Sequence, residues 1–361
     1  MLDLNHKVSI ITVVYNGVNT IEQTIKSVFG QTYKNIEYIV IDGGSTDGTQ
    51  QIIEKHLDKI SYYVSEEDEG LYYAMNKGIK KATGEIVGII NSDDWYDINA
   101  VKNIVECFCN SEADLVYGKT VIVAENGTET VKEVGELQTI WYNAPFLHAS
   151  VFIKKNIYDK LGVFNVKYKI ASDYDLLLRF YVENIKFEYL KKNIAYFRLG
   201  GLSTTQKRVG YDECRSISLT YTERCPYGDK MLLKINEVYD WRCFIENLSD
   251  DENLLSRLLC KYFHKNIKNI VIFGTGSWGE RCFQNLINTG IDVTCFSDNN
   301  SVKWNTEFCD TKVISPKELQ NMDTYVLIAV KYHGEKIKKQ LTYKGNGKLQ
   351  CVCIKEIQEI Q

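Results

Sequence analysis

Short apolar segments alternate with amphipathic ones through the first hundred residues of this 361-residue chain. β-Branched residues are frequent in the apolar segments 8–14, 36–42 and 85–90, which is typical of buried strands. Between the first two of these segments and after the last one, apolar residues recur at helical spacing, in 21–29 and 101–108. The alternation predicts an open α/β sheet, because each strand is followed by a helix that packs on the sheet.

Polar and acidic residues follow two of the predicted strands at the point where each strand ends. Asp42 closes one strand and is followed by Gly43-Gly44, and Asp93-Asp94 follow another. Ligands bind at the carboxyl edge of open α/β sheets, and clustered carboxylates there suit Mg²⁺ or Mn²⁺. The alternative is that Asp93-Asp94 form only a turn and a helix N-cap.

Thr20 with Gln23 three residues later predicts a capping box at the first helix.

The length exceeds that of a usual single domain, and the pattern of elements changes twice along the chain. We predict a catalytic domain over 1–205, a helical connector over 206–265 and a small α/β domain over 266–361.

The charge balance and the cysteines exclude several classes of protein. The chain has 43 basic and 47 acidic residues, so no basic excess points to a nucleic acid. Its eleven cysteines show no zinc spacing, and the odd number in a long chain argues against a disulfide framework. Neither a signal peptide nor an apolar run of about 20 residues is evident, so we expect a cytoplasmic protein.

A second glycine-rich motif, GTGSWG, follows the predicted strand 269–273 and opens a helix. Gly274, Gly276 and Gly279, with Asp298 at the end of the next strand, fit the spacing of a dinucleotide-binding fingerprint. However, about 95 residues are too few for a full two-half Rossmann domain. A structural module, a nucleotide or nucleotide-sugar site, and NAD binding all remain open for this motif.

The motifs of the first domain occur together and in a fixed order. The segment from SIITVVYNG through IVIDGGSTDGTQQII and SEEDEGLYYAMNKG to GIINSDDW, followed by FLHASVFIKKNIYDKLGVFN, SDYDLLLR and FRLGGLST, resembles the family 2 glycosyltransferases. The resemblance covers roughly residues 7–205 and implies a GT-A fold, a mixed sheet with helices on both faces. The C-terminal IVIFGTGSWG segment resembles small Rossmann-like modules attached to sugar-modifying enzymes.

The resemblance implies roles for particular residues. Asp42 corresponds to the carboxylate that reads the nucleotide base, and Val13, Tyr15 and Asn16 correspond to the wall of the nucleotide pocket. Asp93 and Asp94 match the acidic motif that binds the metal and the ribose.

Asp173, in SDYDLLLR, matches the catalytic base of the family. An inverting transfer needs a carboxylate that takes the proton of the acceptor hydroxyl as it attacks the anomeric carbon. The alternative for Asp173 is a plain acid at a helix N-terminus, and Asp175 is the second candidate for the base.

Further candidates for substrate contacts are Lys77, Trp95, His148 and Arg179. Lys77 and Arg179 suit phosphates but equally suit solvated helix faces, and a lone histidine such as His148 is often structural.

Three positions depart from the family pattern. Asn91 replaces the first acid of a D-x-D-D pattern, Ser172 replaces a usual glutamate, and Tyr73 replaces a frequent aspartate, which leaves the donor sugar open. The Gln-x-x-Arg-Trp motif of processive synthases is absent, so we expect transfer of single sugars.

The resemblance thus implies an inverting transferase that uses a UDP-sugar and a divalent cation in surface-polysaccharide synthesis. Its acceptor would be a saccharide or a lipid-linked saccharide, the latter bringing the chain to the inner membrane face. The alternatives are an NAD-dependent oxidoreductase and a nucleotide-sugar-binding regulator that act through GTGSWG.

Overall fold

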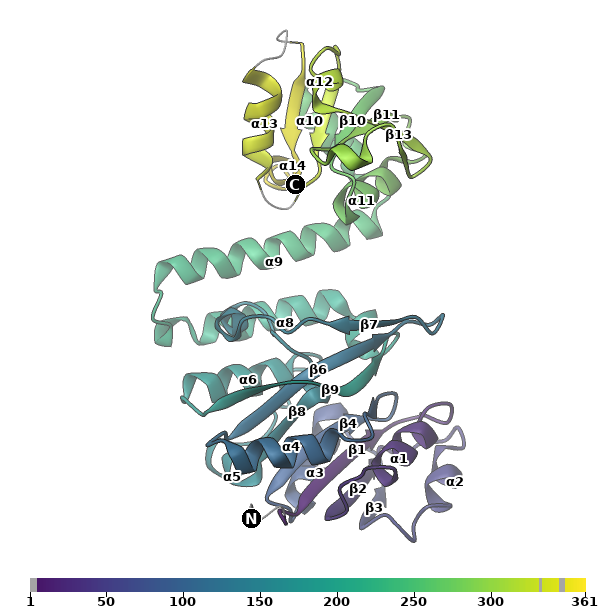
Figure 1. Cartoon of the computed structure of the whole chain (residues 1–361), viewed down its shortest axis with the longest axis vertical. Helices are drawn as coiled ribbons and strands as arrows, with labels where there is room; N and C mark the ends of the chain where they lie inside the picture. The colour runs from purple at the N-terminus through teal and green to yellow at the C-terminus, as the bar shows by residue number, and fades with distance from the viewer. Residues whose placement is uncertain (1–4, 331–332, 344–347) are drawn as a thin grey trace. The chain divides into compact units, whose positions relative to one another are not determined.

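The computed structural model of the chain describes residues 5–330, 333–343 and 348–361. The chain divides into two compact units, Met1–Tyr239 and Asp240–Gln361 (Figure 1). The division falls inside one long helix, α9 (Asp229–Asp250). Helices therefore fill most of the predicted connector, and they are shared between the two units.

The first unit contains a mixed sheet with the strand order β3-β2-β1-β4-β8-β6-β9-β5, and β7 pairs with β6. The first four strands of this order run parallel, whereas β8 is antiparallel to both β4 and β6. The strands are β1 (Val8–Val14), β2 (Ile36–Asp42), β3 (Tyr62–Ser65), β4 (Ile86–Asn91), β5 (Trp95–Tyr96), β6 (Leu115–Val123), β7 (Glu129–Lys132), β8 (Val151–Lys154) and β9 (Phe187–Arg198). The helices are α1 (Ile21–Phe29), α2 (Thr49–Glu54), α3 (Leu71–Lys81), α4 (Ala100–Asn110), η1 (Leu137–Trp141), η2 (His148–Ser150), α5 (Lys155–Leu161), α6 (Ser172–Val182), α7 (Leu202–Thr205), α8 (Lys207–Thr220) and η3 (Thr222–Arg224).

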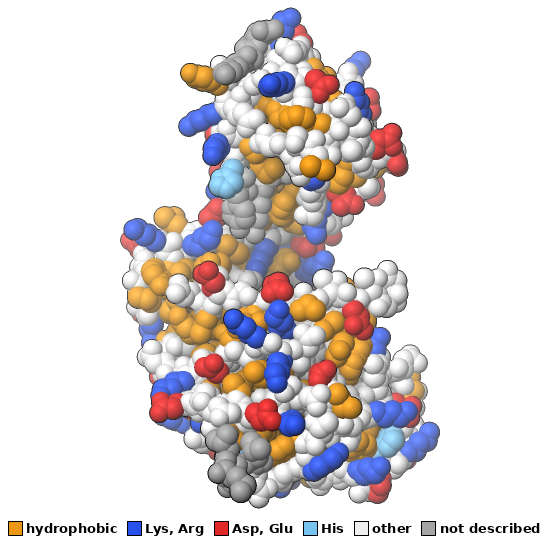
Figure 2. All heavy atoms as spheres, in the orientation of Figure 1, with side chains coloured by type: hydrophobic (Ala, Val, Ile, Leu, Met, Phe, Trp, Pro, Cys, Tyr) orange, Lys and Arg blue, Asp and Glu red, His pale blue; other side chains and the backbone are white. Residues whose placement is uncertain are grey.

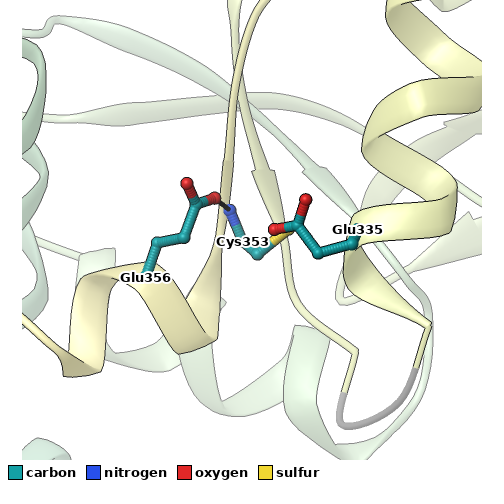
Figure 3. Close-up of side chains that lie close together, drawn as sticks. All are labelled: Glu335, Cys353 and Glu356. Carbon is teal, nitrogen blue, oxygen red and sulfur yellow. Dashed lines mark hydrogen bonds between the residues drawn. The ribbon is translucent and has the colours of Figure 1, made fainter.

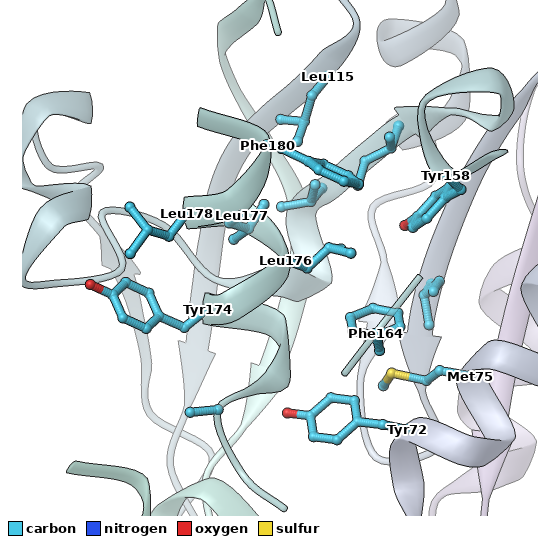
Figure 4. Close-up of a cluster of buried hydrophobic side chains, with 14 of the residues drawn as sticks. Tyr72, Met75, Leu115, Tyr158, Phe164, Tyr174, Leu176, Leu177, Leu178 and Phe180 are labelled. Atoms are coloured by element: carbon cyan, nitrogen blue, oxygen red, sulfur yellow. The ribbon is translucent and has the colours of Figure 1, made fainter. Parts of the chain in front are cut away.

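Helices cover both faces of this sheet because alternate residues of β1 point to opposite sides. Ile11 and Val13 pack with α3 and α6, whereas Val8 and Ile10 pack with α1 and α4. Figure 4 shows the first of these cores, where Tyr72 and Met75 of α3 meet the apolar side chains of α6 around Phe164. The strand pairing and the two cores fix the carboxyl edge of the parallel strands.

The predicted capping box at the start of α1 is wrong. The Thr20 hydroxyl donates to the Gly17 carbonyl at 3.4 Å, and the Gln23 side-chain oxygen accepts from Arg198 at 2.8 Å. A contact with a strand that is distant in sequence has taken the side chain that would have closed the box.

The second unit contains a sheet with the order β12-β13-β11-β10-β14-β15. All pairs are parallel except β12 with β13, so the parallel strands follow the 3-2-1-4-5 order of doubly wound sheets. The strands are β10 (Asn269–Phe273), β11 (Asp292–Ser297), β12 (Glu307–Phe308), β13 (Thr311–Ile314), β14 (Tyr325–Ile328) and β15 (Gln350–Cys353). The helices are α10 (Leu254–Phe263), α11 (Ser277–Leu286), η4 (Ser301–Lys303), α12 (Pro316–Leu319), α13 (Gly334–Tyr343) and α14 (Ile354–Gln358).

The surface and the thiols add three observations. Acidic and basic side chains are interspersed on the face shown in Figure 2. The eleven cysteines all lie in the described part of the chain, and no disulfide bond forms between them. Within the described ranges, no helix is both long and apolar enough to span a membrane.

Candidate active site

The carboxyl ends of four parallel strands lie side by side in the first unit. Val14 of β1 is in register with Asp42 of β2, which is in register with Ser65 of β3. On the other side of β1, Val13 is in register with Asn91 of β4. The predicted site residues at the carboxyl ends of β1, β2 and β4 therefore meet at one edge of the sheet.

Two loops at this edge are joined by hydrogen bonds. The amide of Asn16 donates to the Ser45 hydroxyl at 2.8 Å, and the Asn16 side-chain oxygen accepts from the Thr46 amide at 2.9 Å. Asn16 adopts a positive φ of 52°, and Val13 is buried. Tyr15 is 68% exposed, so its ring is free to cover a flat ligand beside Gly43.

Asp42 is completely buried and holds the second loop in place. Its carboxylate accepts hydrogen bonds from the hydroxyls of Ser45 and Ser65 and from the Ser45 amide. These donors fix the position of the carboxylate inside the protein. A direct contact of Asp42 with a nucleotide base requires one of the two serine hydroxyls to turn away.

The acidic motif after β4 contains two buried oxygen atoms that lack a hydrogen-bond partner among the described residues, Asn91 Oδ1 and Asp94 Oδ2. The other oxygen of Asp94 accepts from the Arg198 amide at 3.0 Å. Burial, together with the neighbouring charge of Asp93, holds the pKa of Asp94 well above its usual range. Burial also raises the pKa of Asp93, against a lowering effect of Arg198.

These residues fit a divalent cation. Buried polar atoms without a partner are rare in proteins, and a carboxylate and an amide oxygen are ligands that Mg²⁺ and Mn²⁺ accept. A cation bound there would displace the proton that burial favours on Asp94. Asp93, Asp94 and the side-chain oxygen of Asn91 would hold it.

Arg198, at the end of β9, is a site residue that the sequence did not reveal. Its guanidinium lies 5.1 Å from the ring of Trp95 and donates to the Asp93 carbonyl at 3.3 Å. On β9, Tyr196 stacks on Trp95 with the ring centroids 5.2 Å apart. The FRLGGLST segment contains this arginine, but nothing in its local pattern shows that β9 pairs with β5 beside the acidic motif.

Asp173 lies in the first turn of α6, and burial raises the pKa of its carboxyl to about 6. The Tyr174 amide donates to Asp173 at 2.8 Å and favours the ionised form, as does the main-chain amide of Asp173 itself. Burial outweighs both effects, and the carboxylate of Glu213 acts in the same direction as burial. A carboxyl with a pKa near 6 is ionised at pH 7 and is basic enough to accept a proton.

His148 lies beside the carboxyl end of β4. This is because β8 runs antiparallel to β4 and begins three residues after His148. Its ring contacts Phe164 at a centroid distance of 5.6 Å, and Phe164 stacks on Tyr72 at 5.4 Å. Burial lowers the pKa of His148 to about 4, so the ring is neutral at pH 7. A neutral imidazole there would act as a hydrogen-bond partner and not as a cation.

The two predicted phosphate-binding cations have partners within the protein. Lys77 forms ion pairs of 2.6 Å with Glu66 and with Asp68, both in the loop that follows β3. The sequence did not single out Asp68 from the other residues of this acidic loop. Its side chain is only 6% exposed in the structure. Lys77 therefore stays near the edge of the sheet, but it is paired with two acidic side chains of that loop.

Arg179 lies further along α6 than Asp173 and donates to the carbonyl oxygens of Leu161 at 2.8 Å and Val163 at 2.7 Å. It also pairs with Asp175 at 3.8 Å. The structure thus places Arg179 where it holds the loop between α5 and α6, and Asp175 is turned toward it.

The glycine-rich loop of GTGSWG belongs to the second unit. Gly274 has a φ of 115°, and a β-carbon on Gly279 would lie 1.9 Å from the Gly274 carbonyl oxygen. A β-carbon on Gly276 would meet no described atom within 4 Å. Asp298 accepts from the amides of Thr275 at 3.0 Å and Asn300 at 2.8 Å. Its carboxylate therefore closes this loop.

These two glycines make a matched pair for a stability test. We expect Gly279→Ala to destabilise the second unit by about 2 kcal/mol or more, because backbone must shift to make room. Gly276→Ala should change the stability by less than about 0.5 kcal/mol, because the new methyl group faces open space. Denaturant unfolding followed by circular dichroism measures both; equal effects of the two variants would contradict the prediction.

Glu335, Cys353 and Glu356 gather elsewhere in the second unit, with ligand atoms within 4.8 Å of one another (Figure 3). Glu356 accepts from the Cys353 amide at 2.7 Å and pairs with Lys338 at 2.7 Å. Burial raises the pKa of the Cys353 thiol to about 12, which keeps it protonated. The cluster is thus satisfied by its own hydrogen bonds and by a lysine.

Comparison with known proteins relates part of the first unit to a family. The model of the family described as glycosyl transferase family 2 matches residues 9–172. Residues 9–172 therefore form a family 2 glycosyltransferase domain. A second family model, C2185-like N-terminal, matches residues 266–348.

Relatives and solved structures agree with this family. An uncharacterized glycosyltransferase of Rickettsia typhi is 32% identical over 199 residues, covering 50% of this chain and 61% of that protein. The chain thus spans less than two thirds of that relative. The structure of residues 1–349 of TarS from S. aureus in complex with UDP-GlcNAc has a TM-score of 0.53 at 19% identity, covering 65% of this chain and 72% of that fragment.

A mannosyltransferase from Pyrobaculum calidifontis, solved with GDP-Man and Mn²⁺, has a TM-score of 0.51 at 17% identity and covers 66% of this chain and 72% of its own. At these identities the likeness shows the fold. The predicted fold class, a GT-A mixed sheet with helices on both faces, is confirmed for the glycosyltransferase domain.

Proposed function

We propose that this chain transfers single sugars, with inversion, from a nucleotide-sugar to a saccharide or lipid-linked acceptor. The observation that carries the proposal is the edge where Asp42, Asn91, Asp93 and Asp94 meet, two of whose buried oxygens lack a partner among the described residues. A strongly perturbed carboxyl, Asp173, completes the set on α6. Perturbed carboxyls next to a ligand edge are typical of catalytic sites.

The proposed chemistry assigns one step to Asp173. The acceptor oxygen forms a bond to the anomeric carbon while the bond from that carbon to the diphosphate oxygen breaks. Asp173 takes the proton of the acceptor hydroxyl, and the bonding electron pair leaves with the nucleoside diphosphate. A carboxyl with a pKa of about 6 is ionised before the step and is able to receive that proton.

The donor end of the site would lie on the sheet edge. Val13, Tyr15 and Asn16 would form the wall of the nucleotide pocket, with the exposed Tyr15 ring covering the base beside Gly43. Asp93, Asp94 and Asn91 would hold Mg²⁺ or Mn²⁺, which when bound supplies positive charge to the departing diphosphate. The structures solved with UDP-GlcNAc and with GDP-Man and Mn²⁺ support this assignment by analogy of fold.

A thermal-shift panel tests the proposal. UDP-, GDP- and dTDP-sugars are each added with and without Mn²⁺, because a ligand stabilises the folded state to which it binds. At 100 times the dissociation constant, one nucleotide-sugar should add about 2.7 kcal/mol to the free energy of unfolding, and only when Mn²⁺ is present. Equal, unshifted melting curves for all nucleotide-sugars would overturn the proposal.

The two alternatives through GTGSWG remain separate hypotheses. The Asp298 carboxylate accepts from Thr275 and Asn300, so it would have to leave these donors to bind the ribose of a dinucleotide. Fluorescence titration with NADH tests the oxidoreductase directly. Nucleotide-sugar binding without any transfer or hydrolysis would instead favour a regulator.

A further inference from the structure

A side chain of α8 holds the loop in front of Asp173. The carboxylate of Glu213 accepts hydrogen bonds from three successive main-chain amides, those of Lys169 at 2.8 Å, Ile170 at 2.9 Å and Ala171 at 2.9 Å. Hydrogen bonds from amides to an ionised carboxylate are about twice as strong as neutral ones. Three of them on one side chain fix the direction in which the chain enters α6.

The packing of α8 brings Glu213 to this position. Gly210 lies one turn before Glu213 on the same helix, and a β-carbon there would lie 3.2 Å from a methyl group of Ile170. The lack of a side chain at Gly210 therefore lets α8 approach the loop closely. On the other side, the Tyr72 hydroxyl of α3 donates to the Ile170 carbonyl at 2.7 Å. The loop is held between α3 and α8.

We propose that Glu213 is a positioning residue for the transfer reaction, which sets the geometry of Asp173 through the backbone of residues 169–171. This inference rests on the proposed function, since it takes Asp173 as the base. Glu213 does not itself touch the reacting atoms. Helix α8 lies beyond the residues that match the family model. The catalytic base would thus be positioned by a segment outside that match.

The charge of Glu213 gives the proposal a readout that a merely structural side chain would not move. Two charged or titratable groups face Asp173 from neighbouring elements, Tyr72 on α3 and Glu213 on α8. Burial raises the pKa of Asp173, and the negative charge of Glu213 adds to this effect. Loss of that charge should lower the pKa of Asp173 and move the acid limb of the pH profile toward lower pH.

The experiment compares Glu213→Gln, Glu213→Asp and Asp212→Asn in the full chain. A glutamine keeps the size of the side chain but turns one acceptor into a donor that faces the amides. We expect kcat to fall about 10- to 100-fold, because small displacements of a catalytic group cost this much, with KM for the donor changed less than about threefold. Glu213→Asp keeps the charge but loses reach, so kcat should fall less and the acid limb should stay in place.

Asp212→Asn is the matched control, since Asp212 is exposed on the same helix and its loss removes the same charge from the surface. It should leave kcat and the pH profile unchanged. Hydrogen exchange of the amides at 169–171 provides a readout besides activity, and it should become faster in Glu213→Gln than in either Asp212→Asn or the parent chain.

Each outcome decides a different point. Unchanged exchange at 169–171 in Glu213→Gln would overturn the anchoring of the loop. Faster exchange with unchanged kcat and an unchanged acid limb would overturn the positioning role while the proposed function stands. Full transfer activity of Asp173→Asn would instead overturn the assignment of Asp173 as the base, and absence of any transfer by the parent chain would overturn the proposed function. The exchange data would still report on the anchor in either case.

Discussion

Asp173→Asn should lose at least about a thousandfold of the sugar-transfer rate while it binds the nucleotide-sugar as tightly as the parent chain. The asparagine keeps the shape of the side chain and the acceptor for the Tyr174 amide, but it cannot take the acceptor proton. Single-turnover transfer, with binding followed separately by calorimetry, separates the two effects. Asp175→Asn is the matched control, because Asp175 lies on the same helix and faces Arg179.

The parent chain should also show this base in its pH profile. The carboxyl must be ionised to act, so kcat/KM should fall about tenfold for each pH unit below the pKa of about 6. The acid limb should be absent from the residual activity of Asp173→Asn. A limb that persists there, or near-complete turnover of this variant with loss of turnover in Asp175→Asn, would contradict the assignment and move the base to Asp175.

Asp173 should also affect how the free energy of unfolding depends on pH. The pKa of Asp173 is raised from 3.8 to about 6 on folding, so the folded state holds the proton more tightly than the unfolded chain. Its contribution to stability is therefore greatest below pH 4 and is lost as the pH rises through 6. Asp173→Asn removes that loss, so this inactive variant should be more stable than the parent above pH 7, by about 1–3 kcal/mol, and similar to it near pH 4. A carboxyl kept at a cost to stability is what a catalytic role would explain.

The sequence predicted the layout of the sheet edge well, because that layout depends on local signals. Buried runs of β-branched residues marked β1, β2 and β4, and the side chains at the end of a parallel strand must lie at its carboxyl edge. The pairing of Asp42 with Val14 and of Asn91 with Val13 follows from that topology.

The sequence did not predict the contacts that arrive from distant segments. Arg198 reaches the acidic motif only because β9 pairs with β5, and Glu213 reaches residues 169–171 only because α8 folds back over the loop. Gln23 was expected in a capping box, but Arg198 takes its side-chain oxygen. Periodicity and spacing describe neighbours within a few turns, whereas these partners lie 43 and 175 residues apart in the sequence.

The contacts seen in the structure also change the interpretation of the site residues that were predicted from motifs. Asp42, Lys77 and Arg179 each have partners that hold loops of the site: hydroxyls for Asp42, carboxylates for Lys77 and main-chain carbonyls for Arg179. A motif identifies a residue that the fold needs near the site, but it does not say whether that residue binds a ligand or supports one that does. In the acidic motif the difference is visible, because two of its oxygen atoms lack a partner within the described residues.

Asp94→Asn should therefore abolish the dependence of nucleotide-sugar binding on Mn²⁺. The amide keeps an oxygen for the Arg198 amide, but it replaces the unpartnered carboxylate oxygen with an NH₂ group that repels a cation. We expect the affinity for UDP in the presence of Mn²⁺ to fall by about 100-fold or more, since the loss of even an outer-shell partner of a metal costs 10- to 100-fold. Calorimetric titration of UDP, with and without Mn²⁺, measures this change.

Stability tells a lost metal ligand apart from a lost fold. Burial holds the pKa of Asp94 well above its usual range. Ionisation of this carboxyl therefore destabilises the folded state when no cation is bound. Asp94→Asn should then melt at the same temperature as the metal-free parent chain or above it. Asp97→Asn, just beyond β5, should keep the dependence on Mn²⁺. A lower melting temperature with unchanged Mn²⁺ dependence would mean that Asp94 only supports the Arg198 backbone, and the cation would then have to be held by Asp93 and Asn91 alone.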